Sequence, residues 1–153
     1  MSDDVKSRLD RTSLDIVAEY AEAICTSDSE RMAACRMEGY QLDFVHRDAS
    51  GGEPLTEREA CQFWEAWFKA FPDMDFQVTR TILAETVAVT QWVFTAVNSG
   101  LITPPISEVV LEPTGKPIRF RGASIFDLNE GKIQHESMYV DFATIWAELG
   151  VTP

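Results

Sequence analysis

The stretch FRGASIFDLNEGKIQHESMYVDFATIWAELG, residues 120–150, decides the fold. It contains two segments in which apolar and polar residues alternate, and the short polar sequence Asn129-Glu130-Gly131 separates them. Alternation of this kind is typical of β-strands with one buried face, and Asn and Gly favour a turn between such strands. The stretch therefore predicts a β-hairpin whose second strand stops at a single acid, Asp141.

Strict alternation in the second strand assigns its residues to two faces. One face would carry Ile133, His135, Ser137, Tyr139 and Asp141, and the other Gln134, Glu136, Met138 and Val140. We expect the first face to line a closed, aromatic cavity. Loss of water there would raise the pKa of Asp141 towards working pH, as a general acid or base requires.

Length and composition predict one domain that spans residues 1–153, with 45% hydrophobic residues to form a core. The chain has 25 acidic and 13 basic residues, which give a formal charge of -12. Such a charge repels nucleic-acid phosphates and anionic lipid heads. We therefore expect neither nucleic acid nor a membrane as a partner, and an anionic substrate is disfavoured.

The three cysteines, Cys25, Cys35 and Cys61, show no C-x-x-C spacing, and we interpret them as reduced core thiols. With two histidines and no Cys or His cluster, we expect no metal site. The Met1 to Asp10 segment is too polar for a secretory signal, and no apolar run is long enough to span a bilayer. These features predict a soluble, cytoplasmic protein.

The first half of the chain carries the spacing of amphipathic helices. Helices are expected over residues 13–26, from a cap at Ser27 to Gly39, and from Leu55 to Phe71. The third helix has a strongly aromatic side, composed of Phe63, Trp64, Trp67, Phe68 and Phe71. Most of these rings should pack in the core, and Trp64 is the one we expect to reach a ligand.

The remaining segments read as strands joined by turns. Strands are expected over residues 40–47, 76–84, 87–97, 118–127 and 132–140. Four prolines between residues 98 and 117 predict a long connection, with a short edge strand at 107–111. Helices followed by a long antiparallel meander indicate an α+β fold, with helices on one side of a curved sheet. The concave side of such a sheet is the default ligand site.

Several short motifs, taken in order, resemble the SnoaL-like polyketide cyclase family of the NTF2-like superfamily. They are FVHRD at 44–48, GGEPLT at 51–56, FPDMDF at 71–76, PTGKPIRFRG at 113–122 and YVDFATIWAELG at 139–150. The resemblance implies a cone-shaped α+β barrel that forms homodimers through the outer face of its sheet. It also implies cofactor-independent chemistry on a small hydrophobic carbonyl compound, as in the aldol cyclases of polyketide esters.

By the same resemblance, Asp141 stands where the cyclases keep a catalytic aspartate. Its implied role is to exchange a proton with an acidic carbon, so that an enolate attacks an internal carbonyl. We take His46 as a second catalytic candidate, hydrogen-bonded to Asp141 or to the substrate. Tyr40, Tyr139 and Trp64 are the candidate substrate-binding residues, and either phenol could donate to an enolate oxygen. The sequence at 95–106, TAVNSGLITPPI, departs from the Gly-Thr-His-like segment of many relatives.

Alternative interpretations remain at this stage. Asp141 is equally suited to cap a helix that begins at Phe142, and in that role its pKa would fall. Proton transfer also starts isomerisation and dehydration, so the reaction type stays open. A non-catalytic module that binds a hydrophobic ligand or dimerises is the alternative class of function. For dimerisation, we expect the outward face to be the one that carries Gln134, Glu136, Met138 and Val140.

Overall fold

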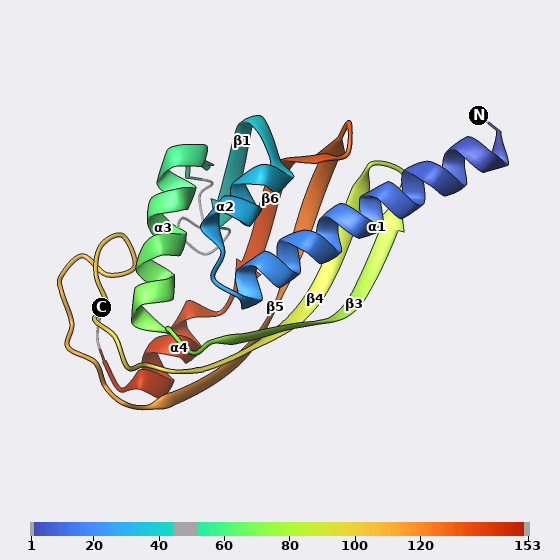
Figure 1. The fold of residues 1–153 in the computed structure, drawn as a ribbon. Helices are drawn as coiled ribbons and strands as arrows, with labels where there is room; N and C mark the ends of the chain where they lie inside the picture. Colours follow the sequence, from blue (N-terminus) through green and yellow to red (C-terminus); the bar gives the residue numbers. More distant parts are fainter. Residues whose placement is uncertain (1, 45–51, 152–153) are drawn as a thin grey trace.

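The structure is a computed structural model that describes residues 2–44 and 52–151 (Figure 1). The helices are α1 (Asp3–Cys25), α2 (Ser29–Cys35), α3 (Glu57–Ala70) and α4 (Phe142–Leu149). The strands are β1 (Arg36–Phe44), β2 (Leu55–Thr56), β3 (Asp75–Ala84), β4 (Val87–Val97), β5 (Pro117–Asn129) and β6 (Lys132–Val140). Strands β3, β4, β5 and β6 lie within a few residues of their predicted bounds, whereas the short edge strand expected at 107–111 is not among the strands of the described residues.

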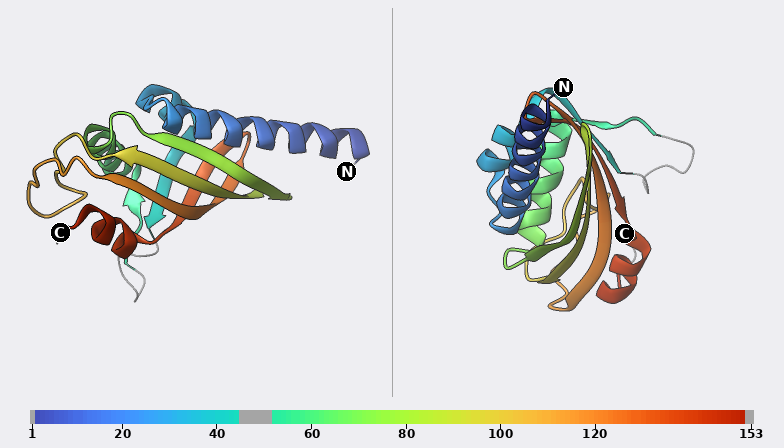
Figure 2. Two further views of the ribbon diagram at one scale, coloured as in Figure 1. Left: turned by 90° about the horizontal axis from the view of Figure 1, so that it is seen from below. Right: turned by 90° about the vertical axis from the view of Figure 1, so that its right-hand side faces the viewer.

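The strands form one curved sheet in the order β2-β1-β6-β5-β4-β3. Neighbours from β6 to β3 are antiparallel, whereas β1 pairs with β6 in parallel, so the meander is interrupted there. Helices α1, α2 and α3 lie on one side of this sheet, as the right-hand view of Figure 2 shows. The predicted α+β class, with helices packed on a curved sheet, is confirmed.

The β5–β6 hairpin forms at the predicted place. Glu130 and Gly131 occupy its two-residue turn, and their φ angles are 51° and 73°. Positive φ at both central residues defines the type I′ turn, which matches the twist of the strands on either side. Asn129 and Lys132 pair directly across the turn, so local turn chemistry is sufficient to set this end of the hairpin.

A bulge follows the turn and reverses the expected faces of β6. Leu128 pairs with Ile133 but Asp127 pairs with His135, so β6 holds one extra residue between these pairs. An extra residue flips every later side chain to the other face of the sheet. Glu136 and Met138 are therefore buried, and Tyr139 is exposed. The predicted face assignment, including the outward Glu136 and Met138 of the expected dimer face, is wrong.

The helices of the first half start and end differently from the prediction. Helix α1 starts ten residues early, and Asp28 rather than Ser27 caps α2 by accepting a hydrogen bond from Arg31 N at 3.0 Å. Gly39 lies inside β1 with a φ of 82° and does not end α2, because the backbone is already extended at Arg36. The predicted start of α3 is confirmed, since the Thr56 hydroxyl accepts from Glu59 N at 3.3 Å.

The connection between β4 and β5 is held in place by Asn98, whose side chain is fully buried. Its Nδ2 donates to the carbonyl oxygens of Ala70 and Gly100, and its Oδ1 accepts from Thr114 N at 2.8 Å. The connection contains a single bridge between Ile102 and Leu111 in place of the expected edge strand. Its two ends are thus fixed to the end of α3, which positions the loop at 105–108 near that helix.

Aromatic side chains fill the space between α3 and the sheet. Trp92 and Phe94 point inwards, which answers the question of which face of β4 is buried. Ring centroids lie 4.8 Å apart for Phe94 and Phe120, and 4.6 Å apart for Trp67 and Phe71. Each buried ring removes a large apolar area from water, so this layer is the main stabilising element of the core.

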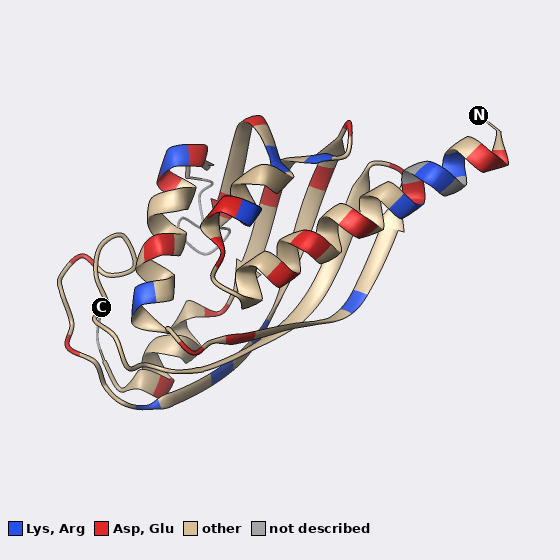
Figure 3. Cartoon of the chain, viewed as in Figure 1, with Lys and Arg blue, Asp and Glu red and all other residues tan. Residues whose placement is uncertain are grey.

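The charges are distributed over the outer surfaces of the helices. Figure 3 shows acidic residues along much of α1. Arg31 of α2 forms ion pairs with Glu19 at 2.8 Å and with Glu22 at 3.3 Å, which tie the first two helices together. Within residues 2–44 and 52–151, none of the helices has both the length and the apolar character needed to cross a membrane.

Candidate ligand-binding site

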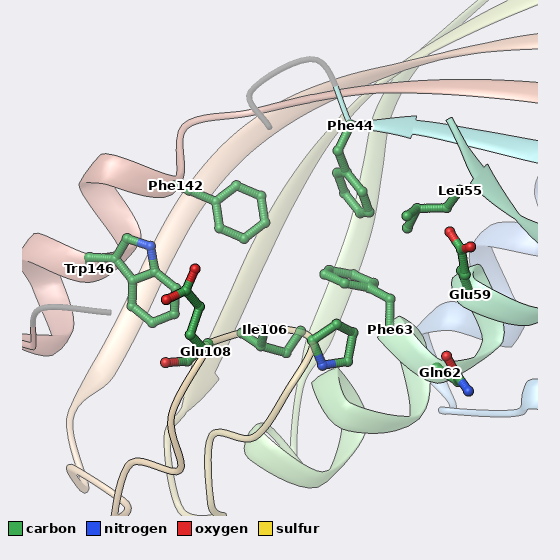
Figure 4. Close-up of a pocket in the computed structure, with 11 residues that line it drawn as sticks. Phe44, Leu55, Glu59, Gln62, Phe63, Ile106, Glu108, Phe142 and Trp146 are labelled. Carbon is green, nitrogen blue, oxygen red and sulfur yellow. The ribbon is translucent and has the colours of Figure 1, made fainter. Parts of the chain in front are cut away.

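A cavity of about 630 Å³ opens where α3, α4 and the loop at 105–108 come together (Figure 4). We call it the mouth cavity. Its walls are Phe44, Leu55, Glu59, Gln62, Phe63, Pro105, Ile106, Ser107, Glu108, Phe142 and Trp146. Phe142 and Trp146 are four residues apart on α4, so both rings lie on the same side of that helix. The volume is in the range of pockets that hold small organic ligands.

The walls of the mouth cavity combine aromatic rings with acidic groups. The Phe44 ring lies 4.5 Å from that of Phe63 and 6.0 Å from that of Phe142, between centroids. Glu59 and Glu108 supply exposed carboxylates, and among the described residues that line the cavity there is no Lys or Arg. The cavity therefore favours an apolar, ring-containing molecule and disfavours an anion.

A second, much smaller space lies deeper, between α3 and the sheet. This interior void measures about 20 Å³. It is lined by Phe44, Phe63, Trp64, Trp67, Met74, Phe76, Trp92, Phe94, Phe120, Met138, Val140 and Phe142. Phe44, Phe63 and Phe142 line both spaces, so these three rings form the wall between them. The closed cavity that we expected above Asp141 is thus filled by aromatic side chains.

Asp141 is exposed and caps α4. Its Oδ1 accepts a hydrogen bond from Thr144 N at 3.1 Å, and its Oδ2 accepts from Thr144 Oγ1 at 2.6 Å. These hydrogen bonds stabilise the charged carboxylate and lower the pKa of Asp141. The expected burial and raised pKa are therefore wrong, because the β6 bulge turns this end of the strand outwards and the helix amides bind the carboxylate.

The other candidate residues lie in different parts of the molecule. Tyr139 is 46% exposed on the outer face of the sheet, and Tyr40 is buried with its hydroxyl directed at Glu136. His46 falls outside the described residues. Trp64 is 5% exposed and lines the interior void. Of the four candidates that the structure describes, Trp64 lines the small interior void and none lines the mouth cavity.

Sequence analysis missed a buried carboxylate, Glu136, whose side chain is completely inaccessible. Its Oε2 accepts hydrogen bonds from Tyr40 at 2.6 Å and from Tyr20 at 3.2 Å. Arg36 Nη2 donates to the Tyr20 hydroxyl at 2.9 Å, and its guanidinium lies 4.6 Å from the Tyr40 ring centroid. We call these four residues the Glu136 cluster. One indication in the sequence is that Glu136 is an acid within a strand of apolar residues. Because of the bulge, strict alternation assigns its side chain to the wrong face.

Electrostatics distinguish the Glu136 cluster from Asp141. Desolvation raises the pKa of Glu136, and the hydrogen bond from Tyr40 together with the charge of Arg36 opposes that rise. Desolvation and the nearby carboxylate also raise the pKa of Tyr40 well above its ordinary value. Strongly shifted groups mark functional sites or buried structural networks. Among the described residues, the space beside Glu136 measures about 10 Å³, which is too small for a ligand.

Comparison with known proteins places this architecture in a family. The model of the family described as SnoaL-like polyketide cyclase matches residues 15–149. The chain belongs to the SnoaL-like polyketide cyclase family. A search of curated proteins gave no significant match.

Solved structures show the same SnoaL-like fold at low sequence identity. AclR from Streptomyces galilaeus is 16% identical with a TM-score of 0.78, over 95% of this chain and 84% of that one. IdmH from Streptomyces antibioticus is 22% identical with a TM-score of 0.73, over 91% and 99%. A ketosteroid isomerase-like protein from Catenulispora acidiphila, in complex with trimethylamine, is 17% identical with a TM-score of 0.66, over 90% and 93%.

Two buried polar atoms of this SnoaL-like protein lack a hydrogen-bond partner among the described residues: Trp64 Nε1 and Glu136 Oε1. Trp92, by contrast, donates from Nε1 to Ser124 Oγ at 3.0 Å. An unpaired buried donor or acceptor costs about 1–3 kcal/mol. Such atoms are therefore candidates for contact with a ligand or with water.

The acidic and sulfur-containing side chains do not gather into a metal site in the part of the chain that the structure describes. No group of three or more His, Cys, Asp or Glu residues there is arranged to hold an ion. The described side chains of this site can supply apolar contacts, hydrogen bonds and proton exchange.

Proposed function

We propose that this SnoaL-like protein binds a mainly apolar, ring-containing carbonyl compound in the mouth cavity. The observation that carries the proposal is a space of about 630 Å³ with aromatic rings on both sides, Phe63 on α3 and Phe142 and Trp146 on α4. Membership of a family described as polyketide cyclases supports a polyketide-like carbonyl compound as the ligand class. The carboxylates of Glu59 and Glu108 and the charge of -12 favour a neutral or cationic molecule.

Binding of 2-acetylnaphthalene, an aromatic ketone, tests this proposal. Calorimetry should give a saturable one-site isotherm with the wild-type protein. Trp146→Ala should weaken binding by about tenfold, because it removes one ring of the wall and its contact area. Val110→Ala is the matched control, since Val110 is 60% exposed in the same loop region and does not line the cavity. Equal affinities for wild type and Trp146→Ala, with both proteins folded, would contradict the location.

Proton transfer on the bound carbonyl compound is the second function that we propose. The family supports it, and Asp141 adjoins Phe142, whose ring lines the mouth cavity. With a lowered pKa, Asp141 is ionised at neutral pH and would act as a proton acceptor at the rim of the cavity. It would be a weak base, because Thr144 stabilises its charge.

Hydrogen–deuterium exchange at the methyl group of 2-acetylnaphthalene measures this step without knowledge of the natural reaction. Asp141→Asn keeps a residue that caps helices well but removes the base. We expect the wild type to accelerate exchange and Asp141→Asn to lose about a hundredfold of that acceleration. If wild type and variant exchange at the same rate, Asp141 has no part in proton transfer. Saturable binding without any exchange would favour the non-catalytic binding module.

We also propose that two copies associate through the outer face of the sheet. Val97 and Tyr139 are both more than 40% exposed there, on β4 and β6. Of the residues that the sequence predicted for this face, Glu136 and Met138 are buried. Sedimentation of the wild type should show a dimer, and Tyr139→Arg should shift the equilibrium to monomer. A wild-type monomer at high concentration would contradict dimerisation.

A further inference from the structure

The indole of Trp64 is an unusual group in the aromatic interior. It packs edge-on against Phe63 at 5.6 Å and tilted against Phe68 at 5.7 Å, and it is 5% exposed. Its Nε1 has no hydrogen-bond partner within the described residues. The other side chains around the interior void are aromatic or aliphatic, together with two methionines. The N–H therefore lies in surroundings that leave its hydrogen-bonding capacity unused.

A buried water molecule would be a poor hydrogen-bond partner for the Trp64 N–H. The void of about 20 Å³ has room for a single molecule, and a stable buried water normally makes two to four hydrogen bonds. Its apolar and aromatic wall offers few partners besides Trp64. A carbonyl oxygen suits this place better, because one donor satisfies it and the rest of its molecule is apolar.

Three aromatic rings separate the mouth cavity from the interior void that Trp64 lines. Phe44, Phe63 and Phe142 line both spaces, and Phe142 is only partly buried at the start of α4. If these rings turn, the small head of a ligand enters the void while its larger ring system stays in the mouth cavity. The sizes agree with this division, since the two spaces measure about 630 and 20 Å³.

We propose that Trp64 Nε1 donates a hydrogen bond to the carbonyl oxygen of the ligand, and that this contact selects ketones and esters over hydrocarbons of the same shape. The inference rests on the proposed function, because it takes the mouth cavity as the ligand site. Trp64 would be a substrate-binding residue whose hydrogen bond also stabilises negative charge that develops on that oxygen.

A matched pair of probes tests the contact. 2-Acetylnaphthalene carries the carbonyl, and 2-ethylnaphthalene has nearly the same shape without it. Trp64→Phe keeps an aromatic ring and removes the N–H. We expect this variant to bind the ketone about tenfold more weakly and the hydrocarbon with unchanged affinity. Without ligand, Trp64→Phe should not lower the melting temperature by removing a hydrogen bond, because the Trp64 N–H donates to none of the described residues.

Trp92→Phe is the control variant, since it removes an N–H that does have a partner, Ser124 Oγ at 3.0 Å. It should lower the melting temperature, because it removes that hydrogen bond. In wild-type protein labelled with ¹⁵N, the indole proton signal of Trp64, assigned by its absence in Trp64→Phe, should move downfield with the ketone alone.

The outcomes separate this inference from the proposed function. If Trp64→Phe weakens both probes equally, the ring contributes contact area only and the hydrogen bond is refuted, while the mouth cavity stands. The same holds if the variant binds the ketone as tightly as the wild type. If the wild type binds neither probe, both proposals fall.

Discussion

The mouth cavity and the Glu136 cluster use the same chemical group in opposite ways. At the mouth, the carboxylates of Glu59 and Glu108 are exposed, and a ligand has room. In the cluster, the carboxylate of Glu136 is fully buried, two phenols donate to it, and the space beside it, as the described residues form it, measures only about 10 Å³. Glu136 and Asp141 are five residues apart, yet burial raises the pKa of one and capping lowers that of the other. Environment, more than sequence position, decides what an acid does here.

The cluster is best explained as a structural element. It connects Tyr20 of α1 and Arg36 and Tyr40 of β1 to Glu136 of β6, elements that are far apart in the chain. Opposite charges on Arg36 and Glu136 share the Tyr20 hydroxyl as an intermediary. Removing one member of a buried charged network leaves the other uncompensated, which is strongly destabilising. Stability measurements should therefore respond to the cluster, and ligand binding to the mouth.

The largest expected effect is that of Arg36→Met. It removes the positive charge near Glu136, and we expect the free energy of unfolding at pH 8 to fall by about 3–5 kcal/mol. Urea unfolding measures the loss. Adding Glu136→Gln to Arg36→Met should recover part of it, because the unpaired charge is then gone. A loss below about 1 kcal/mol for the single variant would mean that Arg36 does not compensate a buried charge.

Gly100→Ala should have the next largest effect, this time at the mouth. A β-carbon at Gly100 would lie 1.7 Å from the carbonyl oxygen of Lys69, so the β4–β5 connection has to move away from α3. We expect a loss of about 1–3 kcal/mol in unfolding free energy and weaker binding of 2-acetylnaphthalene. Gly115→Ala provides a comparison in the same connection, where a β-carbon meets nothing within 4 Å but φ is 69°. If Gly100→Ala binds 2-acetylnaphthalene as tightly as the wild type, the position of the β4–β5 connection does not affect ligand binding.

The effect of Glu136→Gln on the free energy of unfolding should depend on pH. Because the pKa of Glu136 is raised above 4.5, its contribution to stability is fully present below that value and is lost as the pH rises through the folded-state pKa. The wild type should therefore lose stability relative to Glu136→Gln as the pH is raised from 4.5 to 8. Urea unfolding at several pH values measures this difference. A difference independent of pH would show that the buried carboxyl does not change protonation as described.

Asp141→Asn should give the smallest effect, with the opposite dependence on pH. The pKa of Asp141 is lowered below 3.8, so its contribution is present above that value and is lost as the pH falls through the folded-state pKa. Asn also caps helices, and the variant should lie close to the wild type at neutral pH. Unfolding curves at pH 7 and in the acid range compare the two proteins. A variant more stable than the wild type at pH 7 would contradict the capping role.

Local chemistry explains which parts of the fold the sequence predicted. The β5–β6 hairpin followed from alternation and from a turn in which Glu130 and Gly131 adopt positive φ. The cap at Asp141 was also readable as an alternative, because its partner Thr144 is three residues away. These features need only neighbouring residues, so a sequence pattern contains all the information.

Non-local features account for what the sequence did not predict. One extra residue in β6 decides that Glu136 points inwards, and alternation has no means of locating that bulge. The partner Tyr20 is 116 positions away, and the parallel pairing of β1 with β6 brings Tyr40 to the same place. The mouth cavity is similarly built from α3, α4 and a proline-rich loop, whose meeting depends on anchors such as Asn98. Sequence patterns therefore did not predict which residues line the mouth cavity.

The most direct test of the central claim, that the ligand binds at the mouth and not beside the Glu136 cluster, is an NMR titration of the four tryptophan indole signals with 2-acetylnaphthalene. Trp146 lines the mouth cavity, whereas the Trp92 N–H is bound to Ser124 on the sheet. We predict a large, saturable shift for Trp146, because its ring lines the mouth cavity. A saturable shift of Trp92 with Trp146 unmoved would contradict it.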